Sequence, residues 1–170
     1  MMKKLLFFAL VLALVLGLCA CGSDAKFSEA DLSLTVDGVS VTAKSKVADL
    51  LGSFGEGYEY SEAISCVYEG MDKTYEYANV TLYTYPDGDS DRLMELYCVG
   101  GNVATSKGIT FGSTKAEVLA QYGDGCVETG SMLSYELPVS GSDNLPASLY
   151  FMLKDGKVSA IAITAEHRAE

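Results

Sequence analysis

The chain has 170 residues, of which 49% are hydrophobic, and a formal net charge of −11. Its 23 Asp and Glu residues outnumber its 12 Lys and Arg residues, which excludes the clustered positive charge that nucleic-acid binding requires. The negative net charge also argues against electrostatic docking on anionic lipid.

The first twenty residues have the order of an export signal. Lys3 and Lys4 form a short basic region, and an apolar stretch follows over residues 5–18. This stretch is too short to span a bilayer comfortably. The sequence therefore predicts that residues 1–20 are a signal peptide that is removed.

The segment that ends this leader, Leu18-Cys19-Ala20-Cys21, resembles the lipobox of bacterial lipoproteins. The resemblance implies that Cys21 is lipidated, whereas an ordinary secretory signal cut after Ala20 would leave it as a free thiol. Each buried methylene of an acyl chain contributes about 0.8 kcal/mol, so lipidated Cys21 would anchor the chain stably. We expect an extracytoplasmic protein held on the outer face of the bacterial cell membrane, with residues 21–31 as a flexible tether.

Apolar periodicity predicts the elements that follow in chain order. A small hairpin with an Asp37-Gly38 turn is expected over residues 32–42. Two short amphipathic helices are expected, each ending at a glycine, and Thr114 with Glu117 forms a capping box before the second. The helices are predicted at residues 46–54 and 115–122, and the strands at 64–69, 74–85, 92–99, 132–137, 147–153 and 158–164.

This order suggests internal repetition. The predicted fold class is α+β, with two tandem repeats at residues 32–102 and 103–164 and a polar tail at 165–170. Each repeat is a short helix followed by a three-stranded antiparallel sheet, and the hairpin is a small addition at the N-terminus. The sequence leaves open whether the two repeats share one continuous sheet.

Two segments carry a resemblance to known folds. The block from Gly108 to Gly123 and the run Asp155-Gly156-Lys157-Val158 resemble the repeat unit of β-lactamase-inhibitor-protein-like folds and of the small lipoprotein of the outer-membrane assembly machinery. Thr84-Tyr85-Pro86-Asp87-Gly88 belongs to a pattern that is similar to uncharacterised lipoproteins of Gram-positive bacteria. The inhibitor family implies a concave antiparallel sheet that grips a protein partner.

A tyrosine-rich strand is the candidate recognition surface. Alternation over residues 74–85 predicts one tyrosine face, with Glu95 and a further tyrosine of the next strand beside it. Tyrosine is enriched at binding hot spots, although it also forms strands well on ordinary half-exposed sheets. The predicted binding residues are Tyr75, Tyr77, Tyr83, Tyr85 and Tyr97.

Three cysteines follow the lipobox, which allows one disulfide in an exported protein. Cys66 and Cys98 are the favoured pair because both fall on the apolar phase of their predicted strands. The alternative is that these two and Cys126 are small buried hydrophobic residues.

The sequence gives little support to metal binding or catalysis. Asp87, Asp89 and Asp91 start like a calcium-binding loop, but Arg92 and Cys98 stand where that loop needs glycine and glutamate. No zinc or nucleotide motif occurs, and no cofactor is expected. We therefore expect a non-catalytic binding or scaffold protein that recognises an envelope protein or an extracellular ligand. A hydrolase with paired carboxylates and a calcium-dependent sensor are the alternatives.

Overall fold

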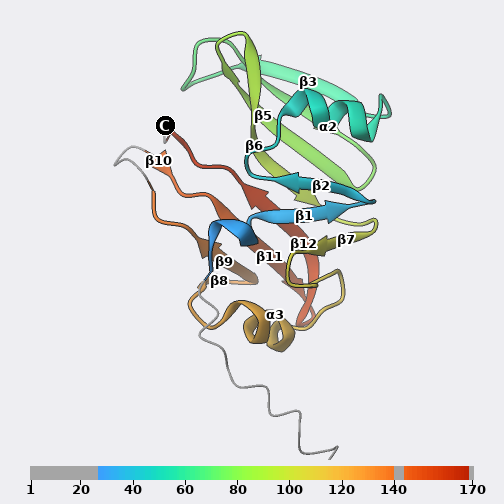
Figure 1. Ribbon diagram of the computed structural model, residues 1–170, viewed down its shortest axis with the longest axis vertical. Helices are drawn as coiled ribbons and strands as arrows, with labels where there is room; N and C mark the ends of the chain where they lie inside the picture. Colours follow the sequence, from blue (N-terminus) through green and yellow to red (C-terminus); the bar gives the residue numbers. More distant parts are fainter. Residues whose placement is uncertain (1–26, 140–143, 169–170) are drawn as a thin grey trace, which may run out of the picture.

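The computed structural model describes residues 27–139 and 144–168 (Figure 1). The predicted signal peptide, Cys21 and most of the predicted tether lie outside these residues. Within the described ranges, no helix has the length and apolar character needed to cross a membrane.

One antiparallel sheet of eight strands dominates the structure. Its two halves come from two halves of the chain and meet where Cys98 pairs with Ile161. The strands follow one another across the sheet as β3 (Glu59–Ile64), β4 (Met71–Glu76), β5 (Val80–Asp87), β6 (Ser90–Cys98), β12 (Lys157–Thr164), β11 (Ser148–Lys154), β9 (Met132–Glu136) and β8 (Val127–Thr129).

The smaller elements lie on one face of this sheet or at its end (Figure 1). A three-stranded sheet is formed by β2 (Val39–Thr42), β1 (Ser33–Val36) and β7 (Val103–Thr105), and a short pair by β10 (Asn144–Leu145) and β13 (His167–Arg168). The helices are the 3-10 turn η1 (Glu29–Asp31) and the α-helices α2 (Val47–Phe54) and α3 (Lys115–Tyr122).

The two α-helices end in the same way. Gly55 and Gly123 follow them with φ of 80° and 82°, a backbone region that favours glycine. The carbonyl oxygen of Gly55 accepts a hydrogen bond from the Tyr77 hydroxyl at 2.8 Å. The hydroxyl of Tyr135 donates to the carbonyl of Gly123 at 2.7 Å. Each helix is thus fixed to the large sheet through its last turn.

The core lies between the large sheet and the layer of helices and small strands. Alternate side chains of the central strands point into it and are fully buried, and the helices contribute Val47, Leu50, Val118 and Tyr122. The buried sheet residues include Leu82, Leu96, Leu133, Leu149, Phe151, Ile161 and Ile163.

The prediction of an α+β fold with two helix-plus-sheet repeats is wrong. The structure is mostly β, with one continuous eight-stranded sheet and, in the described residues, only two α-helices of eight residues each. The edge strands β3 and β8 lie outside the predicted strands, apart from Ile64, because they are short, polar and exposed along their whole length. The N-terminal hairpin is not a separate addition either, since β1 also pairs with β7, with Leu34 opposite Thr105.

Candidate binding face

Three tyrosines and one glutamate lie together on the face of the large sheet that points away from the helices. We call Tyr83, Tyr97, Tyr150 and Glu95 the tyrosine face. All four side chains are partly exposed, whereas their neighbours along each strand are buried, apart from Met94 before Glu95, where the pairing of β5 and β6 is irregular. Because side chains alternate along a strand, these residues belong to the surface opposite the core.

The register of the sheet sets the arrangement. Tyr83 pairs with Glu95 across β5 and β6. One strand further along, Ala162 of β12 lies between Tyr97 of β6 and Tyr150 of β11. The two tyrosine rings, with centroids 6.4 Å apart, flank Ala162, whose exposed fraction is 0%. The two rings therefore cover the methyl group of Ala162 and form one aromatic surface across β6, β12 and β11.

Glu95 is the charged centre of this face. The Tyr150 hydroxyl donates a hydrogen bond to the Glu95 carboxylate. Burial, followed by this hydrogen bond, raises the pKa of Tyr150 above its usual value near 10. Burial and the nearby charges of Glu95 and Glu76 also raise the pKa of Tyr83. Tyr83 and Tyr150 are thus neutral at physiological pH, and the acidic side chains of this face include Glu95 and Glu76.

The structure separates the predicted tyrosines into two groups. Tyr83 and Tyr97 lie on the tyrosine face, next to Glu95 as expected. Tyr75 and Tyr77 lie on the helix side, because residues 74–85 are two strands joined by a turn and not one strand. Tyr75 pairs with Leu82 and is only 7% exposed, and Tyr77 holds the end of α2.

Tyr85 is also covered, although it lies in β5. Its ring stacks on that of Tyr68 at 4.5 Å, which leaves it 8% exposed. Tyr150 was not among the predicted binding residues. The sequence could have placed Tyr150 on the outer face of its strand, because the apolar residues on either side of it, Leu149 and Phe151, point into the core.

The three cysteines after the lipobox are free in the structure. Cys98 is buried opposite Val80, and burial raises its pKa to about 12. Cys66 is exposed in the β3–β4 loop, where Gly70 approaches Pro86 at the other end of the β5–β6 hairpin. Six residues of strand separate these ends by about 20 Å. The structure thus does not bring together the predicted pair Cys66 and Cys98, since a disulfide needs a Cα separation below about 7 Å.

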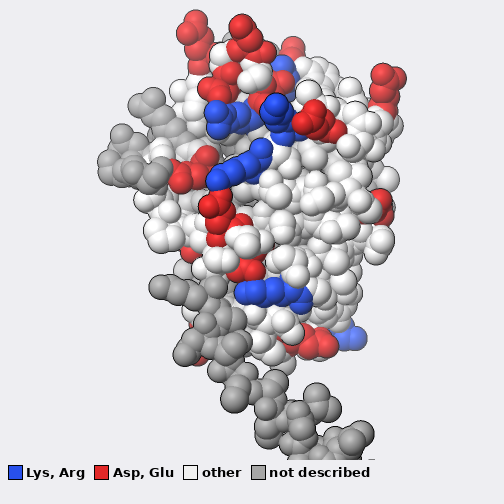
Figure 2. All heavy atoms as spheres, in the orientation of Figure 1, with Lys and Arg blue, Asp and Glu red and all other residues white. Residues whose placement is uncertain are grey.

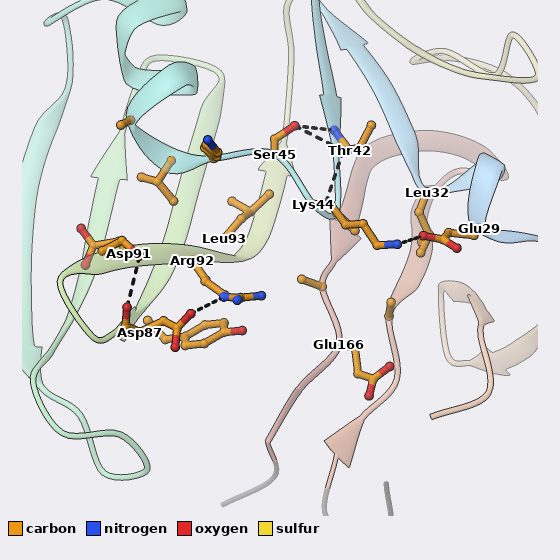
Figure 3. A pocket seen from close by; sticks show the side chains of 18 of the residues that line it. Glu29, Leu32, Thr42, Lys44, Ser45, Asp87, Asp91, Arg92, Leu93 and Glu166 are labelled. Carbon is orange, nitrogen blue, oxygen red and sulfur yellow. Dashed lines mark hydrogen bonds and ion pairs between the residues drawn. The ribbon is translucent and has the colours of Figure 1, made fainter. Parts of the chain in front are cut away.

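A groove of about 1540 Å³ opens near the start of α2, between the tip of the β5–β6 hairpin and the C-terminal segment (Figure 3). Leu32 and Leu93 are among its buried apolar residues. Acidic and basic side chains alternate on this side of the molecule (Figure 2). On the rim Lys44 forms an ion pair with Glu29, and Arg92 with Asp87 at 2.6 Å. In these exposed ion pairs each charge is already paired within the chain, and such pairs contribute little to the free energy of folding.

Two of the three predicted calcium-loop residues form ion pairs with basic side chains. Asp87 binds Arg92, and Asp91 binds Lys73 at 2.9 Å. In the described part of the chain, no group of three or more His, Cys, Asp or Glu residues is arranged as metal ligands would be. His167 lies in β13, with its ring 6.4 Å from that of Tyr85.

Comparisons of the chain with protein-family models, with curated proteins and with solved structures give no match. The resemblance to the inhibitor-like folds and to bacterial lipoproteins therefore stays a prediction from the sequence. The function has to be argued from the residues of the tyrosine face.

Proposed function

We propose that this chain is a lipid-anchored extracytoplasmic binding protein without catalytic activity, which recognises an envelope protein or extracellular ligand through its tyrosine face. The observation that carries the proposal is the cluster of three partly exposed tyrosines around the carboxylate of Glu95. Cys21 is the proposed site of the lipid anchor.

The chemistry of the face favours basic side chains of the partner. An aromatic ring attracts a cation with about 0.5–1 kcal/mol at an exposed site and about 2 kcal/mol when the pair is desolvated. The Glu95 carboxylate adds a direct ionic partner, and Glu76 is exposed on the same face in β4, opposite Thr81 of β5. The net charge of −11 steers cationic partners toward the protein in the same sense.

Tyrosine also suits this role for an entropic reason. A tyrosine side chain has two rotatable bonds and presents a large rigid surface, so little freedom is lost when it is covered. Tyr150 is already held by its hydrogen bond to Glu95. The face is therefore organised before a partner arrives.

The two alternative functions have less support. The sequence singles out no carboxylate pair for a hydrolase, and two acids that line the groove, Asp87 and Asp91, form ion pairs with Arg92 and Lys73. The same two ion pairs compete with calcium for the oxygens that a sensor would use.

The test is a pull-down from detergent-solubilised envelope that compares the full chain with the double variant Tyr97→Ser/Tyr150→Ser. The matched control is Tyr58→Ser, which removes a partly exposed tyrosine on the helix side. Circular dichroism first establishes that these three proteins and a fourth, Glu95→Gln, are folded. We expect a basic partner that the wild type and Tyr58→Ser retain, and that the double variant and Glu95→Gln lose. Equal capture by all four proteins would overturn the proposal.

The anchor is tested separately. Cys21→Ser is expected to move the protein from the membrane fraction to the soluble fraction and to remove the mass of the acyl chains. An unchanged mass and fractionation would show that Cys21 is not lipidated, whatever the tyrosine face binds.

A further inference from the structure

Strand β3 forms one edge of the large sheet (Figure 1). All six of its residues are exposed. It pairs with β4 over its whole length, from Glu59 opposite Glu76 to Ile64 opposite Met71, without a bulge. Proteins usually blunt such edges with proline, lysine, a bulge or a very short strand. Strand β3 has none of these four devices, and its two charged residues, Glu59 and Glu62, oppose pairing with an acidic strand but not with a basic one.

The register shows which backbone groups face outward. The Ser65 amide donates to the Gly70 carbonyl at 3.1 Å and continues the β3–β4 ladder by one pair. Hydrogen-bonded and non-hydrogen-bonded pairs alternate in an antiparallel ladder. Counting back from Ser65, the residues bonded to β4 are Glu59, Ser61 and Ala63. The amide and carbonyl groups of Tyr60, Glu62 and Ile64 therefore point away from the sheet.

The side chains along this edge combine acidic and apolar character. Tyr60 and Ile64 are 49% and 81% exposed, and Glu62 lies between them on the same side of the strand. The Tyr60 hydroxyl donates a hydrogen bond to the Glu62 carboxylate and keeps it beside the edge. Glu59 lies on the other side of β3, paired with Glu76.

Charge decides which strand fits this edge. The one basic residue of β4, Lys73, is held by Asp91, so the charge along the edge is negative. A second copy of the chain would bring the same acidic edge and a net charge of −11. Like charges beside each other on paired strands are destabilising, whereas opposite charges stabilise the pair.

We propose that the β3 edge accepts an extended segment of a basic protein, in which Lys or Arg alternates with apolar residues, as a ninth strand of the sheet. The outward-pointing backbone amide and carbonyl groups of Tyr60, Glu62 and Ile64 form the hydrogen bonds to this added strand, a mode of recognition called β-augmentation. Because side chains alternate along a strand, all basic residues of such a segment lie on one side. On the side of Tyr60, Glu62 and Ile64 their charges meet Glu62 and their aliphatic stems cover Tyr60 and Ile64, while the apolar residues lie on the other side of the sheet. This surface is separate from the tyrosine face.

The experiment measures binding of an acetylated and amidated octapeptide of alternating Lys and Val to the full chain in detergent, by fluorescence anisotropy. The control peptides carry Glu in place of Lys, or are N-methylated at every residue so that they donate no backbone hydrogen bond. We expect the Lys-Val peptide to bind and both control peptides to fail.

Two variants of one residue separate backbone pairing from charge. Glu62→Gln removes the charge and keeps the amide, whereas Glu62→Pro removes both. Proline is tolerated there because the Glu62 amide is not bonded to β4. We expect Glu62→Pro to bind the peptide about tenfold more weakly than Glu62→Gln, because a backbone hydrogen bond and access to the edge are lost.

The tyrosine-face variant Tyr97→Ser/Tyr150→Ser should bind the peptide as the wild type does, so that failure of one surface is distinguishable from failure of the other. Three results would overturn the proposal. They are equal binding of the Lys-Val and Glu-Val peptides, equal affinity of Glu62→Pro and Glu62→Gln, and self-association through β3 in sedimentation experiments in place of peptide binding.

Discussion

Replacing Tyr135 by phenylalanine tests how the second helix is fixed to the sheet. The tyrosine is 2% exposed, and its ring packs on Tyr122 at 5.3 Å. Phenylalanine keeps this ring contact and removes only the hydroxyl that donates to Gly123. A hydrogen bond of this kind contributes about 0.5–1.5 kcal/mol net. Because Gly123 is partly exposed, water replaces part of the loss, and we expect a decrease of about 1 kcal/mol in the free energy of unfolding.

Urea denaturation followed by circular dichroism measures this decrease, and the melting temperature should fall by roughly 2–4 °C. Tyr97→Phe is the control, since that hydroxyl lies on the open face, and it should stay within about 0.5 kcal/mol of the wild type. Equal stabilities of the two variants would refute the reasoning that the tyrosine hydroxyl fixes the last turn of α3.

Three other outcomes follow from the structure. Phe151→Ala should lower the free energy of unfolding by about 3–5 kcal/mol, measured by urea denaturation, because Phe151 is fully buried in the core. The raised pKa of Tyr150 makes its contribution to stability complete below pH 10 and progressively lost as the pH rises through the folded-state pKa, so Tyr150→Phe should flatten the loss of stability above pH 10. In native protein at pH 8, a thiol reagent should modify Cys66 quickly and Cys98 only after unfolding, as read by mass spectrometry; no reaction of either cysteine after unfolding would indicate a disulfide.

Local signals in the sequence predicted several elements well. Helices α2 and α3 were expected within one residue of their observed bounds, and the Thr114 and Glu117 capping box is present. The β1–β2 hairpin turns at Asp37 and Gly38, as the dipeptide indicated. These features depend on residues close together in the chain, so composition and spacing were enough to find them.

The tyrosine face was only partly predicted, and the reason is one hairpin. The chain reverses at Ala78 and Asn79, where the Tyr77 amide donates to the Val80 carbonyl. An odd residue of β4 therefore shares its face with an even residue of β5, as Tyr75 does with Leu82. The prediction treated residues 74–85 as one strand and continued the alternation of faces across the turn. It therefore placed Tyr75 and Tyr77 on the wrong face.

Long-range pairing set the rest of the architecture. The contact of β6 with β12 joins Cys98 to Ile161 and makes one sheet from two halves. Strand β12 is an apolar run that is buried on both faces where it pairs with β6, but such a run does not say which strand lies beside it. The same pairing brings Tyr150 beside Glu95, across 55 residues of sequence. The centre of the candidate site is thus a product of the tertiary structure.

The measurement that tests the tyrosine face most directly is hydroxyl-radical footprinting of the full chain with and without solubilised envelope. The account predicts that oxidation of Tyr83, Tyr97 and Tyr150 falls when the envelope is present, while oxidation of Tyr58 on the helix side does not change. Protection of Tyr58 with no change at the other three tyrosines would contradict it.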